Sequence, residues 1–198
     1  MGKSDSNFKA MVGTLLVITI ISGALLGAIN NLTLEPKAQA KMAQKIKALK
    51  LVLPKFDNNP VDEVKMVSLS GTADSTEIYP ALKSGAQVGA AVVGSSEKGF
   101  SGTIKIMVGF NADGTIKNIA VLEQKETPGL GTKMKDEKFL QQFRTRNPSE
   151  FKLKVTKDGG EVDALTGATI TTRAFCEATQ SAWEAFENNR MTLATQKN

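Results

Sequence analysis

The chain of 198 residues contains no histidine and only one cysteine, Cys176. Without histidine it cannot form a Ser-His-Asp triad or a Cys-His pair. It also cannot supply, by itself, a zinc site of the Cys/His kind, a histidine-ligated haem or a four-cysteine iron–sulfur cluster. One cysteine cannot form an internal disulfide, so cysteine usage says nothing about the compartment. Redox chemistry in this protein would therefore need an organic cofactor.

Aromatic residues are scarce, and the excess of positive charge is confined to one end. The net charge is +5, with one Trp and one Tyr. Residues 1–55 hold eight Lys and two acidic residues, whereas the rest of the chain holds 17 basic and 18 acidic residues. This distribution favours membrane lipid headgroups as the partner of the basic residues. It lacks the interleaved basic and aromatic residues of a nucleic-acid-binding surface, so we expect no nucleic-acid partner.

No charged residue occurs in residues 10–34. A helix of this length crosses the ~30 Å hydrocarbon layer of a bilayer. We therefore predict a transmembrane helix over residues 10–34, preceded by a cytoplasmic N-terminus over residues 1–9. A cleaved signal peptide is the alternative, because Ala38-Gln39-Ala40 resembles a cleavage site, but the apolar run exceeds the usual ~7–15 residues. Five Lys residues follow the span and two precede it, which by the positive-inside rule favours a cytoplasmic C-terminus.

The remainder of the sequence indicates an α+β fold. Apolar residues at helical spacing predict a membrane-proximal helix over residues 36–53, within a segment that runs with its linker over residues 35–60. From residue 61 to 198 we expect one domain with a twisted antiparallel sheet and packed helices. Strands are predicted at residues 65–70, 87–93, 102–110 and 116–122, the last two joined by a turn at Asn111-Ala112-Asp113-Gly114. Helices are predicted at residues 136–146 and 172–187.

The last predicted helix has a strongly amphipathic pattern. Thr171 or Thr172 is a plausible N-cap, and the helix should end near residues 188 and 189. We expect Cys176, within it, to be a small buried residue rather than a reactive thiol. The residues expected to face the core are Phe175, Ala178, Ala182, Ala185 and Phe186.

Two short motifs stand out by composition. The segment from Asp163 to Thr169 reads DALTGAT and directly precedes the last helix. Small residues there leave the Thr169 hydroxyl accessible, and a helix N-terminus favours an anion. The loop from Glu126 to Gly131 reads ETPGLG and combines a stiffening Pro with two Gly. Taken alone, each motif is also explained as an ordinary turn or tight loop.

Four motifs in one order carry a family resemblance. They are Gly99-Phe100-Ser101-Gly102, the Asp113-Gly114 turn, the Glu126–Gly131 loop and Thr166-Gly167-Ala168-Thr169. This set resembles the FMN-binding domain of the G subunit of the Rnf electron-transport complex. The C subunit of the sodium-translocating NADH:quinone reductase shares that domain. Phe100 stands where these families commonly have Tyr, and Thr166 where Ser is commoner.

The resemblance implies a covalent cofactor and assigns residues to it. Thr169 would carry FMN through a phosphoester, and Asp163 would be recognised by the flavin transferase that moves FMN from FAD. No metal site is implied. The other implied cofactor-binding residues are Thr166, Gly167, Ala168 and Thr172 near the phosphate, and Glu126, Thr127, Gly129, Leu130 and Gly131 in the loop, where backbone N–H groups and Leu130 suit the isoalloxazine ring.

The resemblance also implies a function, which is electron transfer within an ion-translocating complex. The chain would be a membrane-anchored flavoprotein subunit, not catalytic alone, of a complex that moves electrons between ferredoxin and NAD. Its partners would be polytopic membrane subunits and iron–sulfur subunits, and its domain would lie outside the cytoplasmic membrane, against the simple charge rule. The alternatives are a C subunit of the quinone reductase and a non-redox anchored binding module.

Overall fold

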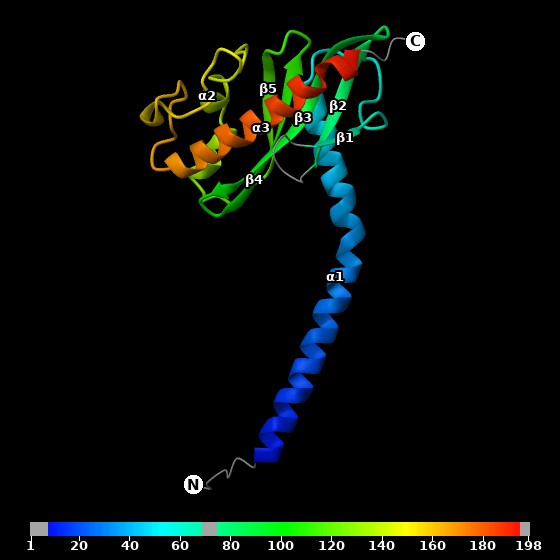
Figure 1. Cartoon of the computed structure of the whole chain (residues 1–198). Coiled ribbons are helices and arrows are strands. Elements are labelled where there is room, and N and C mark those ends of the chain that lie inside the picture. The colour runs from blue at the N-terminus through cyan, green and yellow to red at the C-terminus, as the bar shows by residue number, and fades with distance from the viewer. Residues whose placement is uncertain (1–7, 69–74, 195–198) are drawn as a thin grey trace. The chain divides into compact units, whose positions relative to one another are not determined.

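The computed structural model describes residues 8–68 and 75–194 of the chain (Figure 1). It separates into two compact units that meet between Ala43 and Gln44. Helix α1 (Phe8–Val52) is continuous through this point and contains Pro36. The two helices predicted over residues 10–34 and 36–53 are therefore one helix. Pro36 removes a single backbone hydrogen bond, and the Ala-, Lys- and Gln-rich residues after it have high helix propensity.

In the described residues, the first unit is α1 from Phe8 to Ala43, which includes the apolar run. Every described residue from 8 to 32 is exposed, although most of these side chains are apolar. By length and composition this helix can cross a membrane. It fits a single-pass membrane anchor.

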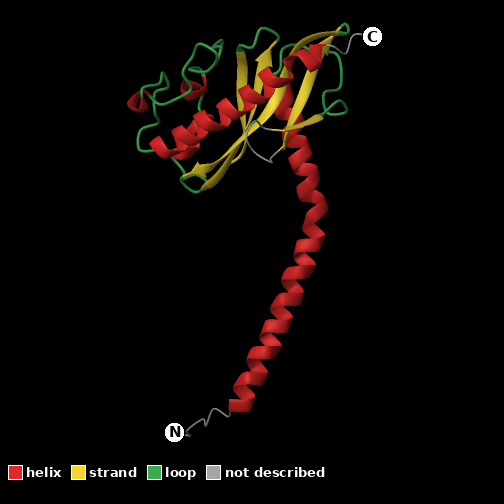
Figure 2. Ribbon diagram, viewed as in Figure 1, coloured by secondary structure: helices red, strands yellow, loops and turns green. Residues whose placement is uncertain are grey.

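The second unit is built on a five-stranded antiparallel sheet (Figure 2). Its strands are β1 (Lys65–Ser68), β2 (Ser75–Lys83), β3 (Ala86–Gly99), β4 (Gly102–Asn111) and β5 (Ile116–Glu123). They lie in the sheet in chain order, as a meander. After β5 come the 3₁₀ helix η1 (Gly131–Lys135), α2 (Glu137–Leu140), the 3₁₀ helix η2 (Thr156–Asp158) and α3 (Thr169–Ala194).

The sheet is covered on both faces. Helix α3 packs mainly on β3 and β4, and its alanine and phenylalanine side chains share one core cluster with the sheet. A second cluster joins the end of α1, through Leu49 and Val52, to residues such as Tyr79 and Met107. Helix α3 therefore crosses one face of the sheet (Figure 2), and the last turns of α1 pack on the other.

The α+β class and the β4–β5 hairpin are as predicted. The pairing of Phe110 with Ile116 closes the hairpin, and Gly114 adopts φ +89° in its turn. The prediction for the buried face of the last helix is also confirmed, because all five residues named for it are at most 1% exposed. Strong local patterns therefore identified both elements correctly.

The sequence prediction missed β2 and shortened β3, which runs on to Gly99. Pro80 lies in the middle of β2, and a proline normally argues against a sheet interior. It is tolerated because β1 pairs only with residues 75–78, so that the edge of β2 beside Pro80 is free of β1. Of the strand predicted at residues 65–70, the structure gives β1 to Ser68, and residues 69 and 70 lie outside the described residues.

Two helix predictions were wrong in extent. The helix expected at 136–146 is only the four residues of α2. Thr145 adopts φ +59°, and its amide and the Arg146 carbonyl both bond to the backbone of Ile116, which draws the chain away from a helical path. Helix α3 begins at Thr169 rather than 172 and continues to Ala194 rather than ending near 188 and 189.

A partly buried ion pair fixes the end of α1 to β2. The Lys45 ammonium lies 2.7 Å from the Glu77 carboxylate, which also accepts a hydrogen bond from the Tyr79 hydroxyl at 2.8 Å. Burial raises the pKa of Glu77, but the hydrogen bonds from Lys45 and Tyr79 outweigh it and leave this pKa below its ordinary value. The ionised carboxylate therefore stabilises the folded domain.

We expect Glu77→Gln to lower the free energy of unfolding by about 1 kcal/mol at pH 7. Because the folded pKa lies below the unfolded one, this contribution is present above the ordinary value of 4.5 and is lost as the pH falls through the folded pKa. Urea unfolding of the full chain in detergent at pH 7 and pH 3 measures it. Glu150→Gln, an exposed carboxylate, is the control. A loss of equal size at both pH values would contradict the assignment.

Candidate functional site: a cavity at the start of α3

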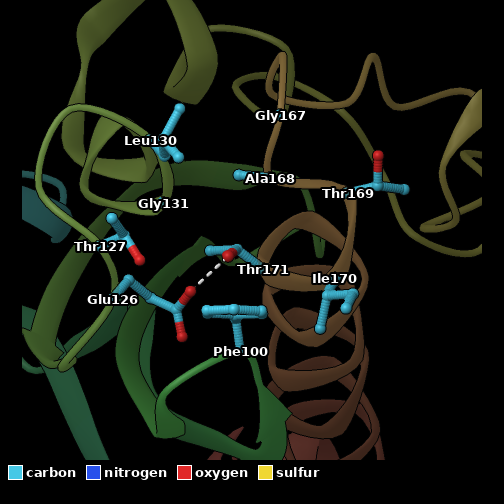
Figure 3. Close-up of a pocket in the computed structure, with 10 residues that line it drawn as sticks. All are labelled: Phe100, Glu126, Thr127, Leu130, Gly131, Gly167, Ala168, Thr169, Ile170 and Thr171. Atoms are coloured by element: carbon cyan, nitrogen blue, oxygen red, sulfur yellow. Dashed lines mark hydrogen bonds between the residues drawn. The ribbon is translucent and has the colours of Figure 1, made fainter.

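A cavity of about 430 Å³ lies where three segments meet at one end of the sheet (Figure 3). The turn between β3 and β4, the loop after β5 and the start of α3 each form one wall. Its volume is in the range typical of small-molecule sites. The lining residues are Phe100, Glu126, Thr127, Leu130, Gly131 and residues 167–171. Two motifs 35 residues or more apart in the sequence, ETPGLG and TGAT, thus form one site.

Thr169 is the first residue of α3 and lies on the helical wall of the cavity. The first helical hydrogen bond runs from the Thr172 amide to the Ala168 carbonyl, at 3.0 Å. Ala168 is therefore the N-cap, and the amides of Thr169, Ile170 and Thr171 precede the helical ladder. The predicted N-caps Thr171 and Thr172 were wrong, because both residues lie inside the first turn. An alanine N-cap has no side-chain acceptor for these amides.

Thr172 holds the turn before the helix together. Its hydroxyl donates to the Ala168 carbonyl at 3.0 Å and accepts from the Leu165 amide at 3.1 Å. The side chain is fully buried and does not line the cavity. Gly167, at φ +75°, provides the left-handed bend that this turn requires. Together they present residues 167–169 at the cavity in a fixed conformation.

Glu126 lies at the base of the opposite wall and is 4% exposed. One carboxylate oxygen accepts a hydrogen bond from the Ser101 amide at 3.0 Å. The other accepts a hydrogen bond from the Thr171 hydroxyl (Figure 3). Its carboxylate therefore contacts both of the other walls. Glu126 was predicted for the site from its motif, but no sequence pattern indicates these two contacts.

Glycine is required at Gly131 by lack of space and at Gly129 by the backbone conformation. A Cβ at Gly131 would lie 2.7 Å from Glu126 Oε2 and 2.9 Å from the Thr171 hydroxyl, so the backbone must pass close to both. Gly129 has open space around it but adopts φ +76°. The turn is closed by the Thr132 hydroxyl, which accepts from the Gly129 amide at 3.0 Å. Gly131 is thus part of the cavity wall, and Gly129 shapes the turn beside it.

Large apolar side chains line the cavity yet remain accessible to solvent. Phe100 is 65% exposed, Ile170 46% and Leu130 42%, one from each wall. Exposed apolar surface is costly unless something covers it, so this arrangement is typical of a binding site. Sequence analysis assigned Leu130 to the site but missed Ile170. Its only signal was its place directly after Thr169, in a helical turn that had been expected to begin later.

Four residues predicted for the site lie outside the lining of the cavity: Thr166, Thr172, Gly129 and Asp163. Thr166 is exposed in the turn before α3. Asp163 has an exposed side chain, while its amide donates to the Gln142 side chain at 2.7 Å. The side chains of Asp163 and Thr166 therefore lie on the surface near Thr169 in the sequence. Thr127, by contrast, lines the cavity as expected.

Cys176 is a buried residue of α3, as expected from the sequence, with 2% of its surface exposed. Burial, and to a lesser degree the charge of Asp158, raises the pKa of its thiol to about 12. The thiol is therefore not ionised at neutral pH and is not a nucleophile. The chemistry of this site depends on hydroxyls, backbone amides and one carboxylate.

Comparison with known proteins gives a consistent result. Residues 99–184 match the family model of the FMN-binding domain. The chain is 32% identical over 195 residues to the G subunit of the ion-translocating oxidoreductase complex of Vibrio cholerae serotype O1, covering 93% of this chain and 92% of that one. Its identity to the corresponding G subunit of Aliivibrio fischeri is 34%, over 91% of each chain.

Among solved structures, the crystal structure of Shewanella oneidensis NqrC is similar at 23% identity and a TM-score of 0.48. The structural match covers 70% of this chain and 68% of the NqrC chain. The extent and level of identity to the two G-subunit sequences decide the assignment. This chain belongs to the family of G subunits of ion-translocating oxidoreductase complexes.

Proposed function

We propose that this protein is the membrane-anchored, electron-carrying subunit of an ion-translocating oxidoreductase complex and that it carries electrons on FMN. The cavity between the two motifs is the observation that carries the proposal, because it lies inside the segment that matches the FMN-binding domain. The chain has no histidine and one buried cysteine, so its own side chains do not offer a redox group. The cofactor supplies reversible electron transfer, and the protein binds and orients it.

The residues present fit FMN at both of its ends. Amides at the start of α3 and an N-cap without a side-chain acceptor favour a phosphate beside Thr169. Three accessible apolar side chains, from Phe100, Leu130 and Ile170, offer surface for a flat ring. Their position on three walls supports binding of the isoalloxazine within the cavity rather than on one flat surface.

Attachment of the FMN phosphate to the Thr169 hydroxyl is the finer part of the proposal. Thr169 is half-buried on the cavity wall, so its hydroxyl can be reached while the helix turn behind it stays packed. The exposed Asp163 and Thr166 beside it are surface features that a flavin transferase can recognise. In this arrangement the helix N-terminus stabilises the remaining negative charge of the phosphodiester.

The complex supplies the other partners. A single span is too little to form an ion path, so ion translocation belongs to polytopic subunits, and iron–sulfur subunits exchange electrons with the flavin. The resemblance noted in the sequence extends this to ferredoxin and NAD as the terminal substrates. The basic residues after the span lie where lipid headgroups can contact them.

The domain, by this proposal, lies on the extracytoplasmic side of the membrane. A covalent tether suits that location, because a dissociated flavin would be lost there. A C subunit of the quinone reductase is the competing assignment, but the sequence relatives matched over more than nine-tenths of their length are G subunits. They also disfavour a non-redox anchored module.

Thr169→Ala should abolish covalent attachment of flavin, because it removes the hydroxyl that forms the phosphoester. The chain, produced with its flavin transferase, should show flavin fluorescence on a denaturing gel and the added mass of FMN in intact-mass measurement. Thr156→Ala, on η2 away from the cavity, is the matched control. Covalent flavin retained in Thr169→Ala would exclude this residue.

Membrane orientation can be tested with fusions at the C-terminus. A periplasmic alkaline phosphatase fusion should be active, and a green fluorescent protein fusion should stay dark. The same reporters at the N-terminus should give the opposite pattern. A fluorescent C-terminal fusion would place the domain in the cytoplasm and contradict the proposal.

The Glu126–Gly131 loop should contact the ring rather than the phosphate. An added Cβ at Gly131 collides with Glu126 and Thr171, so Gly131→Ala should change the absorbance and potential of the flavin while leaving it attached. Gly129→Ala meets no neighbour and strains only the backbone, by about 1 kcal/mol. It should therefore perturb the flavin less. If Gly131→Ala leaves the spectrum and potential unchanged in folded protein, the loop does not contact the ring.

A further inference from the structure

A buried carboxylate connects all three walls of the cavity. Glu126 belongs to the loop after β5, its Oε1 accepts from Ser101 in the β3–β4 turn, and its Oε2 accepts from Thr171 in α3. A neutral apolar side chain could not accept either hydrogen bond. Loss of the carboxylate would leave the Ser101 amide and the Thr171 hydroxyl without these bonds, which costs free energy in a buried site.

The backbone is shaped around this carboxylate. A Cβ at Gly99 would lie 2.9 Å from Glu126 Oε1, and a Cβ at Gly131 would lie 2.7 Å from Oε2. Both glycines therefore allow main chain to approach within contact distance of the two oxygens. The carboxylate is enclosed by backbone on two sides and faces the cavity that it helps to line.

No lysine or arginine neutralises this group in the part of the chain that the structure describes. The ion pairs formed there involve Glu77, Glu137, Asp158, Glu177 and Glu187, but not Glu126. Its two hydrogen bonds come from neutral donors. An ion pair would cancel most of the field of a carboxylate, whereas two neutral dipoles leave a net negative potential in the cavity.

We infer that Glu126 is a positioning residue that fixes the three walls of the cavity and that its negative charge lowers the reduction potential of the bound flavin. The inference rests on the proposed function, since it requires FMN in this cavity. FMN bound in this cavity would gain negative charge when it is reduced. Placing that charge near an unpaired carboxylate is opposed by charge repulsion, which is weakly screened in a protein-lined cavity.

Glu126→Gln tests the charge. The amide keeps the shape of the side chain and an oxygen that can accept from Ser101, but it has no net charge. In the full chain, flavinylated by its transferase, the equilibrium constant for one-electron reduction should rise about tenfold, which corresponds to about 59 mV. Titration with dithionite against redox dyes measures it. Glu123→Gln removes the same charge from an exposed residue three positions earlier and should leave the potential unchanged.

Thr171→Val tests the positioning separately. It removes one hydrogen bond but keeps the Glu126 charge, so the potential should not rise. The cavity wall should loosen, and quenching of flavin fluorescence by acrylamide, a neutral quencher, should increase. A purely structural role for Glu126 would instead shift the potential in the same direction in both variants.

The outcomes separate this inference from the proposed function. A parent chain that takes up no flavin at all contradicts the function itself. If both the parent and Glu126→Gln carry flavin and their flavin potentials are equal, the proposed role of the Glu126 charge is wrong, while the proposed function stands. If Glu126→Gln does not fold, the Thr171→Val chain decides, because unchanged acrylamide quenching there overturns the positioning role.

Discussion

The packing of α3 against β3 and β4 determines where the site can form. Alanines recur along the buried face of the helix, at Ala174, Ala178, Ala182 and Ala185, so the helix lies close to the sheet. Gly94 makes room for it, since a Cβ there would lie 2.0 Å from the Ala178 carbonyl oxygen. With the body of α3 fixed in this way, its first residue must lie at the end of the sheet.

The antiparallel register then brings the other two walls to the same place. Gly99 pairs with Gly102 at the β3–β4 turn, and Lys105 pairs with Glu123 near the end of β5. The turn and the loop after β5 therefore emerge at one end of the sheet, opposite the start of α3. Segments from three regions of the chain meet there. The cavity follows from the topology, and its chemistry follows from the few residues that the topology exposes.

Both signs of charge meet at the first turn of α3. The amides before the helical ladder present partial positive charge, and the Glu126 carboxylate accepts a hydrogen bond from the Thr171 hydroxyl in the same turn. A phosphate at Thr169, as proposed, would be attracted by these amides and repelled by the carboxylate. The proposed covalent bond would hold it against that repulsion.

Sequence patterns predicted the elements whose local and tertiary preferences agree. The hairpin at Asp113-Gly114 and the buried face of α3 are of this kind. Where tertiary contacts override local preference, prediction failed. β2 was not predicted because it contains Pro80. The proline is tolerated there because β1 is short and does not pair with β2 beside Pro80. The predicted N-cap was wrong because a helix beginning at an alanine contradicts the usual preference.

The site was only partly predicted, because some of its features depend on tertiary contacts. The motifs identified residues on two of its walls, since each motif is continuous in sequence. The role of Glu126 depends on contacts between walls, and the position of Ile170 depends on where α3 begins; no local pattern encodes either. The resemblance singled out Thr169 but also placed Thr172 near the phosphate, whereas the Thr172 hydroxyl bonds within the turn and does not line the cavity.

The openness of the site is relevant to the covalent attachment proposed for FMN. Sites that retain a small molecule by affinity alone usually bury most of its surface, about 70–90%. Here the three large apolar side chains of the cavity, Phe100, Leu130 and Ile170, are between 42% and 65% exposed. A covalent bond holds the ligand at high effective concentration without enclosing it. An open cavity of this kind would leave one edge of the proposed flavin near the surface, which shortens the distance to an electron-transfer partner.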